Sequence, residues 1–233
     1  MKPATLRIRI RKLFRLTVLI IAPFACGVKH MPIENSDRIV FLGDSITELG
    51  VQPYGYVTLL RDSLTKKHPN ITVIGAGVSG NRVPQLQERL DRDVLSKKPT
   101  IVIIYIGIND VWHFLLNGNG TPKDKYEAGL GDIIERIQKA DARVILCTPT
   151  VIGEKHHGDN QLDAQLDEYS DISRRVANRF GVSLCDLRKA FINYLRTHNP
   201  GNNEKGILTV DGVHLNNDGN QLVADAMMKC LEQ

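Results

Sequence analysis

The sequence predicts an α/β fold in which helices cover both faces of a parallel β-sheet. Short runs of apolar and β-branched residues alternate along the chain with longer segments whose apolar residues recur at helical spacing. The run 101–106 is apolar throughout, as expected for a strand buried on both faces of a sheet. The 233 residues contain no internal repeat and no interior linker, so we expect one large domain over residues 29–233.

The first element is the apolar run 38–42, which stops at a glycine and is predicted to be a strand. The segment 56–67 follows, with Val57, Leu60 and Leu64 on one helical face. The same two patterns continue to the end of the chain. In order, they predict strands at 71–74, 101–106, 143–147 and 182–187, and helices at 84–95, 123–140, 162–180, 189–196 and 221–231.

Three longer segments, 111–122, 151–160 and 198–211, are predicted to be irregular. Long loops on a rigid scaffold often form the walls of a binding site. In an open parallel sheet, ligands bind beyond the carboxyl ends of the strands. The residues that directly follow the strands are therefore the first place to look for function.

The first 28 residues differ from the rest of the chain. Six basic residues and no acidic one precede the apolar run 16–26, which is the pattern of a secretory signal. The run is short for a bilayer span and contains Pro23. We therefore predict export to the periplasm or the extracellular space, with residues 1–28 as a signal peptide and no stable membrane span in the mature form. Lipid attachment at Cys26 and an uncleaved N-terminal anchor are the alternatives.

The formal net charge of +4 arises from this N-terminal segment. Without its six basic residues the chain has no basic excess, which argues against a nucleic-acid partner. Outside this segment, Cys147, Cys185 and Cys230 are odd in number and form no Cys-x-x-Cys motif. We predict buried free thiols and no zinc site.

Polar motifs follow three of the predicted strands, and a fourth motif lies near the C-terminus. Ser45 comes just after the first strand, in the sequence Gly-Asp-Ser-Ile-Thr. Gly80 follows the second strand and Asn109 the third, while Asp211 precedes His214 by three residues. Because the carboxyl ends of parallel strands lie at one edge of a sheet, we expect these residues to converge.

These residue types can perform acyl transfer. A serine hydroxyl becomes an effective nucleophile when a base takes its proton, and a carboxylate can orient that base and stabilise its protonated form. The spacing of Asp211 and His214 suits this pairing in a turn. The backbone amides of Ser45 and Gly80 and the side-chain amide of Asn109 are candidate donors to a developing oxyanion. Each residue alone has an ordinary explanation, such as a helix cap or a turn, but together they indicate a hydrolytic site.

The four motifs resemble those of the SGNH hydrolases, also called the GDSL esterase/lipase family. The similarity extends over about residues 37–231, with the blocks 43–47, 80–81, 107–110 and 211–214 in the family's order. The resemblance implies a flavodoxin-like three-layer α/β/α sandwich with a five-stranded parallel sheet. It also implies a Ser-His-Asp triad of Ser45, His214 and Asp211, an oxyanion hole of Ser45, Gly80 and Asn109, and no metal or organic cofactor.

We therefore predict a serine esterase that hydrolyses carboxylic esters through an acyl-enzyme. Asp44, Tyr54 and Trp112 are expected to line the substrate pocket. The loops 111–122 and 151–160 contain few large apolar residues. This favours short acyl groups, such as acetyl esters of carbohydrates or small alcohols, as substrates.

Three other functions compete with this prediction. A lysophospholipase or thioesterase would use the same residues on lipid substrates, and a non-catalytic member would bind carbohydrate in the same cleft. A nucleotide-binding protein is suggested by Gly75, Gly77 and Gly80, but no acidic residue completes that fingerprint. The order Ser, Asp, His also occurs in α/β-hydrolases, whose Gly-x-Ser-x-Gly motif is absent because position 47 is threonine.

Overall fold

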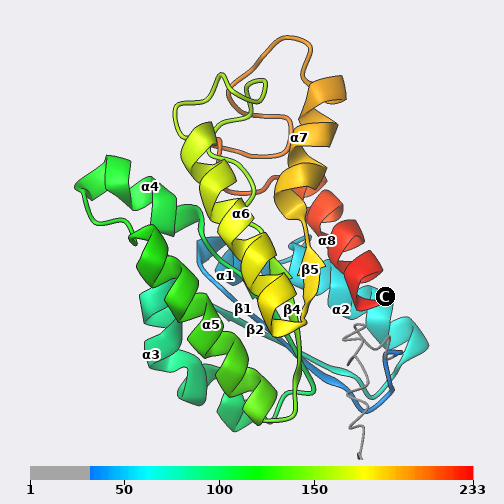
Figure 1. Cartoon of the computed structure of the whole chain (residues 1–233). Helices are drawn as coiled ribbons and strands as arrows, with labels where there is room; N and C mark the ends of the chain where they lie inside the picture. Colours follow the sequence, from blue (N-terminus) through cyan, green and yellow to red (C-terminus); the bar gives the residue numbers. More distant parts are fainter. Residues whose placement is uncertain (1–31, 233) are drawn as a thin grey trace, which may run out of the picture.

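The computed structural model describes residues 32–232, so the predicted signal peptide lies outside the described residues. Five strands form one parallel sheet, in the order β2-β1-β3-β4-β5 (Figure 1). This order is that of flavodoxin-like folds, in which the first strand lies inside the sheet. The strands are β1 (Arg38–Gly43), β2 (Thr72–Gly77), β3 (Ile101–Tyr105), β4 (Arg143–Cys147) and β5 (Ser183–Cys185).

Helices cover both faces of the sheet (Figure 1). They are α1 (Ser45–Gly50), α2 (Tyr56–Lys67), α3 (Val83–Asp93), a 3₁₀ turn (Leu95–Lys97), α4 (Ile108–Asn117), α5 (Lys123–Lys139), α6 (Asp163–Phe180), α7 (Leu187–His198) and α8 (Asn217–Leu231). On one face α8 packs against α2 and α7, and on the other α5 packs between α3 and α6. The predicted three-layer α/β/α fold is confirmed. Within residues 32–232, no helix combines the length and apolarity that a membrane crossing requires.

The core follows the predicted apolar runs. All five residues of β3 are buried, because this central strand is covered by helices on both faces. Cys147 and Cys185 occupy paired positions in β4 and β5 and are buried, while Cys230 in α8 is partly exposed. All three are free thiols.

One predicted loop is wrong. The segment 111–122 was expected to be irregular, but α4 takes up the first half of it. The helix buries Val111, while its outer side carries Phe114, Leu115 and Leu116, which are 40%, 51% and 56% exposed. α4 has ten residues and starts inside the polar motif 107–110, so the sequence contains no long periodic run here by which a helix is recognised. The other two predicted loops, 151–160 and 198–211, contain no helix or strand apart from His198, which is the last residue of α7.

β2 extends three residues beyond its predicted end, through Gly75 and Gly77. Gly77 lies against the backbone of α1, where a Cβ atom would approach the backbone nitrogen of Glu48 to 2.1 Å. Glycine is needed at this position because no side chain fits between the strand and the helix. The contact places the loop after β2 beside the first turn of α1.

A buried carboxyl group caps α1. Asp44 is 2% exposed, and its Oδ1 accepts a hydrogen bond of 3.0 Å from the backbone N–H of Ile46. Burial raises the pKa of Asp44 to about 7, and the nearby carboxyl of Asp110 adds to the shift, while the hydrogen bond from Ile46 opposes it. Near neutral pH, the connection between β1 and α1 therefore contains a carboxyl group that titrates.

We predict that Asp44→Asn flattens the dependence of stability on pH. Because the pKa of Asp44 is higher in the folded state than in the unfolded chain, folding stability from this group is present below pH 4 and is lost as pH rises towards about 7. Asparagine keeps an oxygen that can cap α1 but does not titrate. Between pH 4 and 8 the free energy of unfolding should fall in the wild type by up to about 4 kcal/mol relative to the variant.

Urea unfolding at both pH values measures this difference. Asp62→Asn, at an exposed carboxylate of α2, is the control and should leave the pH dependence as in the wild type. Parallel pH curves for the wild type and Asp44→Asn would contradict a raised pKa.

Candidate active site

The structure brings the predicted polar residues to the carboxyl edge of the sheet. Ser45 is the first residue of α1, directly after β1. Gly80 lies in the loop after β2, and Asn109 in the first turn of α4 after β3. Because β1 lies between β2 and β3, these three residues follow three neighbouring strands. Asp211 and His214 come from the long connection between α7 and α8.

Ser45, His214 and Asp211 form a continuous chain of hydrogen bonds. The Oγ of Ser45 lies 2.9 Å from Nε2 of His214, and the Nδ1 of His214 lies 2.7 Å from Oδ2 of Asp211. A carboxylate accepts only, so Nδ1 carries the proton and Nε2 accepts from the serine hydroxyl. This is the arrangement that activates a serine for attack on a carbonyl carbon.

Asp211 is held by the turn that it starts. Its Oδ1 accepts hydrogen bonds from the backbone N–H groups of Val213 and His214, at 2.9 and 2.8 Å. Partial burial raises the pKa of Asp211, but the hydrogen bond from the His214 ring and these two backbone bonds outweigh it and lower the pKa below its ordinary value. Asp211 is therefore ionised at neutral pH and accepts the hydrogen bond from Nδ1 of His214.

The predicted donors for an oxyanion, Gly80 and Asn109, lie after β2 and β3. Gly80 has a φ of +76°, as the third residue of a turn that is closed by a hydrogen bond from Asn81 N–H to the carbonyl of Val78. The Nδ2 of Asn109 donates to the carbonyl of Asn81 at 3.1 Å. An amide nitrogen carries two N–H groups, so the second can serve a substrate oxygen.

Arg89, which the sequence analysis did not single out, joins these loops. It is 6% exposed, and its guanidinium donates to the carbonyls of Gly43 and Ala76 at 2.7 and 2.9 Å. Its Nε donates to Oδ1 of Asn81 at 2.7 Å. The end of β1, the end of β2 and the turn with Gly80 are thus tied to one side chain. The only sequence signal is an arginine between Leu86 and Leu90 on the inward face of α3.

Asp110, beside Asn109, makes a similar link. Its Oδ1 accepts a hydrogen bond of 3.0 Å from the backbone N–H of Val83 at the start of α3. Burial raises the pKa of this carboxyl to about 6, although its hydrogen bonds oppose the shift. Asp110 therefore connects the start of α4 to the segment that follows Gly80.

Of the three residues predicted for the substrate pocket, only Trp112 lies in a cavity. Its ring is 6.5 Å from the His214 ring, edge to face. Asp44 is buried as a helix cap, and Tyr54 is 70% exposed in the connection from α1 to α2. The cavity has a volume of about 420 Å³ and reaches Asp211. Its other lining residues are Leu115, Ile152, Gly153, Lys155, Asp159, Asn160, Gln161, Leu162, Glu204, Gly212 and Val213.

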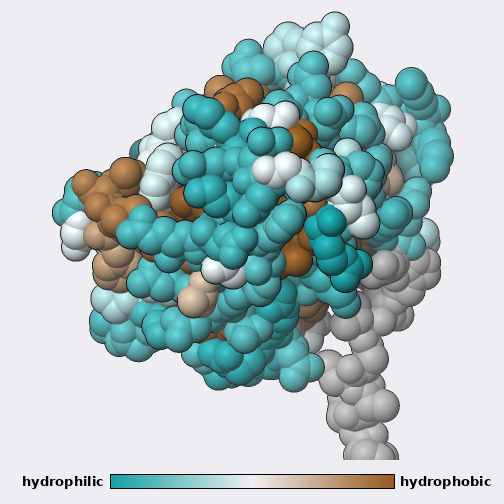
Figure 2. All heavy atoms as spheres, turned by 90° about the horizontal axis from the view of Figure 1, so that it is seen from above, coloured by the Kyte–Doolittle hydropathy of each residue, from teal (hydrophilic) through white to brown (hydrophobic). Residues whose placement is uncertain are grey.

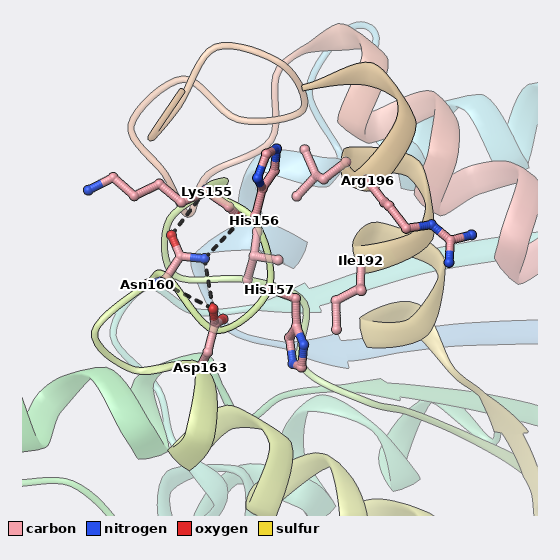
Figure 3. A pocket seen from close by; sticks show the side chains of 9 residues that line it. Lys155, His156, His157, Asn160, Asp163, Ile192 and Arg196 are labelled. Carbon is pink, nitrogen blue, oxygen red and sulfur yellow. Dashed lines mark hydrogen bonds between the residues drawn. The ribbon is translucent and has the colours of Figure 1, made fainter. Parts of the chain in front are cut away.

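A second cavity of about 220 Å³ lies between the segment 151–163 and α7 (Figure 3). His156 and His157, which are adjacent in sequence, both line it. The Nε2 of His156 is bonded to the carbonyl of Asn199, and that of His157 to the carboxylate of Asp167. Both rings therefore have partners that fix this segment to its neighbours.

Comparison with known proteins gives the same result as the motifs. Residues 41–222 match the model of the GDSL-like Lipase/Acylhydrolase family. An acetylxylan esterase of Geobacillus stearothermophilus is 29% identical over 216 residues, which cover 85% of this chain and 95% of that protein. The isoamyl acetate-hydrolyzing esterase 1 homolog of Rattus norvegicus is 29% identical over 80% of this chain and 78% of its own length.

Among solved structures, the acetyl xylan esterase AlAXEase superposes with a TM-score of 0.81 at 43% sequence identity. The match covers 83% of this chain and 99% of that one. The predicted family is thereby confirmed. The chain belongs to the GDSL-like lipase/acylhydrolase family and is a carboxylic ester hydrolase.

Proposed function

We propose that this protein is a serine esterase that removes acetyl groups from carbohydrates, with Ser45, His214 and Asp211 as its triad. The observation that carries the proposal is the unbroken chain of two hydrogen bonds from the serine Oγ, through the imidazole, to the carboxylate. Two relatives are named as an acetylxylan esterase and an isoamyl acetate-hydrolyzing esterase 1 homolog. These names support an acetyl ester as substrate.

The first half of the proposed reaction forms an acyl-enzyme. The Oγ of Ser45 attacks the ester carbonyl carbon while Nε2 of His214 takes the hydroxyl proton, and Asp211 stabilises the imidazolium. The negative charge that develops on the carbonyl oxygen is received by the amides of Ser45, Gly80 and Asn109. The bond to the alcohol oxygen then breaks, and His214 returns the proton to that oxygen.

In the second half, water takes the place of the alcohol. His214 removes a proton from the water molecule as its oxygen attacks the acyl carbon, and the same three donors receive the oxyanion. Collapse of this intermediate breaks the bond to Oγ and releases acetate. His214 returns the proton to Ser45, so the enzyme is unchanged after one turnover.

The cavity beside Asp211 supports a polar alcohol as leaving group. Its walls combine one aromatic ring, Trp112, with amide and charged side chains such as Gln161, Asp159 and Glu204. Sites of this kind suit a ligand with many hydroxyl groups, because each hydroxyl needs a donor or acceptor when it leaves water. A sugar that carries an acetyl group fits this description.

A second candidate, a lipid ester hydrolase, is favoured by one observation. Phe114, Leu115 and Leu116 form an exposed apolar patch at the end of α4. Figure 2 shows apolar side chains at the left margin of a face that is otherwise mostly hydrophilic. Long acyl chains could lie on such a patch. Rates on p-nitrophenyl esters from acetate to palmitate separate the two candidates, because an acetyl esterase loses activity as the acyl chain lengthens.

We propose that residues 29–233 form a single exported domain, and that residues 1–28 direct the export. The support is the basic segment followed by an apolar run in the sequence.

Ser45→Ala tests the nucleophile. Without the hydroxyl no acyl-enzyme forms, so turnover of p-nitrophenyl acetate should fall about 10⁶-fold, as in other serine hydrolases. The exposed Ser96, which only donates to a backbone carbonyl at the end of α3, provides the control variant Ser96→Ala. If Ser45→Ala hydrolyses the ester as fast as the wild type, another group performs the chemistry.

Trp112→Ala tests the carbohydrate site. Loss of the ring should raise KM for acetylated xylo-oligosaccharides about tenfold, since about 1.4 kcal/mol of binding is a tenfold change, and should alter kcat for p-nitrophenyl acetate little. Phe114→Ala, an aromatic residue on the same helix but outside the cavity, is the matched control. Equal KM values for Trp112→Ala and the wild type would place the sugar elsewhere.

Export predicts the N-terminus of the mature protein. Edman sequencing of protein from the periplasm or medium should begin at a residue within 26–29. A blocked Cys26 with the added mass of a lipid would instead establish a lipid anchor. Soluble cytoplasmic protein that starts at Met1 would contradict export.

A further inference from the structure

The segment 199–216, here called the histidine loop, carries Asp211 and His214 but has little regular structure of its own. Its only strand-like pairing is an isolated antiparallel bridge between Thr209 and Leu215. Buried backbone N–H and C=O groups need partners, and this loop obtains them partly from its own residues, as in the bond from Val210 N–H to the carbonyl of His214, and partly from other parts of the chain. The position of His214 depends on where these partners are.

Glu154, which lies outside the loop, accepts several of the loop's hydrogen bonds. Its side chain is fully buried, and its two oxygens accept four hydrogen bonds. The backbone N–H groups of Ile207 and Leu208 each donate at 2.7 Å, and Thr209 donates both its N–H and its hydroxyl, the latter at 2.8 Å. Within residues 32–232, no lysine, arginine or histidine forms an ion pair with this carboxylate at a distance of 4.0 Å or less.

The backbone of Glu154 is also bonded to the loop. Its N–H donates to the carbonyl of Glu204 at 2.8 Å, and its carbonyl accepts from Nδ2 of Asn199 at 2.7 Å. Glu154 therefore contacts the histidine loop at its beginning and in its middle. Oε1 accepts three of these four hydrogen bonds and Oε2 accepts one, and a carboxylate, which has no donor of its own, suits such a set of donors better than a neutral amide of the same size.

Two further bonds connect this contact to the turn of the triad. The hydroxyl of Thr209, which donates to Glu154, accepts from the backbone N–H of Gly212 at 3.0 Å. The carbonyl of Gly212 accepts from the N–H of Gly153 at 2.8 Å. Gly212 lies between Asp211 and His214, and its φ of +99° forms the turn that joins them. The N–H of this glycine is thus held by Thr209, which is bonded to Glu154, and its carbonyl is held by Gly153, the neighbour of Glu154.

The segment that holds Glu154 is itself rigidly bonded (Figure 3). Asn160 accepts from the backbone N–H of Lys155 through Oδ1 and donates to the Lys155 carbonyl through Nδ2, both at 3.1 Å. Its Nδ2 also donates to the carboxylate of Asp163 at 2.9 Å, at the start of α6. The base from which Glu154 reaches the histidine loop is therefore anchored to the outer helix layer.

From this geometry we infer that Glu154 is a positioning residue of the hydrolytic reaction: its buried carboxylate, through Thr209, holds the turn of Asp211 and His214 at hydrogen-bond distance from Ser45. The inference rests on the proposed function. If the carboxylate is lost, the loop N–H groups lack their acceptor and the turn is free to shift. A displacement of the base of about 1 Å reduces turnover about 10²-fold.

Glu154→Gln tests this directly. Glutamine has the same size, but its NH₂ group faces backbone donors. We expect kcat for p-nitrophenyl acetate to fall about 10²-fold while KM stays within about twofold, because the misplaced group is the base and not the substrate-binding wall. Asp186→Asn is the matched control: that carboxylate accepts from Lys189 N–H and pairs with Arg174, so its loss should lower Tm and leave kcat unchanged.

A second pair of variants keeps the test decisive if Glu154→Gln does not fold. Thr209→Val removes the hydroxyl that links Glu154 to Gly212 at nearly constant volume, and Thr209→Ser keeps it. Thr209→Val should lower kcat by about the same factor as Glu154→Gln. Thr209→Ser should keep kcat within about threefold of the wild type. The double variant with Glu154→Gln should lose less than the product of the two single losses, because both act through one chain of bonds.

The outcomes separate the two proposals. A wild-type protein without esterase activity would remove the proposed function and this inference with it. An active wild type with unchanged kcat in both Glu154→Gln and Thr209→Val would overturn the inference alone. Equal kcat in Thr209→Val and Thr209→Ser would also overturn it, because the hydroxyl at position 209 would then have no effect on the reaction.

Discussion

The hydrogen bond of 2.9 Å between Ser45 and His214 joins residues 169 positions apart in the chain. Neither residue can reach the other by local structure, because Ser45 belongs to the first helix after β1 and His214 to the last loop before α8. The bond exists only when the whole sheet and its outer layer are assembled.

Two charged residues hold the two sides of the site in complementary ways. On the nucleophile side, the buried guanidinium of Arg89 gathers backbone carbonyls from the ends of β1 and β2. On the histidine side, the buried carboxylate of Glu154 gathers backbone N–H groups from a loop without regular structure. Each charge is stabilised by several hydrogen bonds to main-chain dipoles, which offset the cost of burying it. These hydrogen bonds fix the irregular segments of the site, as the hydrogen bonds between strands fix a sheet.

Much of the fold could be predicted because its strands are apolar runs and most of its helices have one apolar face. The end of β2 and the existence of α4 could not, since Gly77 depends on a contact with α1, and α4 is short and starts inside a polar motif. The proposed nucleophile and oxyanion donors followed from residues placed after strands, and the pair of Asp211 and His214 from its spacing near the C-terminus. Arg89 and Glu154 were missed because a buried charge gains its meaning from tertiary partners, and nothing in the neighbouring sequence reveals those partners.

Asp211 and His214 are three residues apart on one turn, and the carboxylate bonds to the backbone of that turn as well as to the imidazole. The turn therefore holds Asp211 and His214 in a fixed position relative to each other. A substitution or an insertion in the preceding stretch, 199–206, changes the position of this turn relative to Ser45. It does not separate Asp211 from His214. A change elsewhere in the walls of the site leaves the hydrogen bond between Asp211 and His214 in place, because that bond lies within one turn.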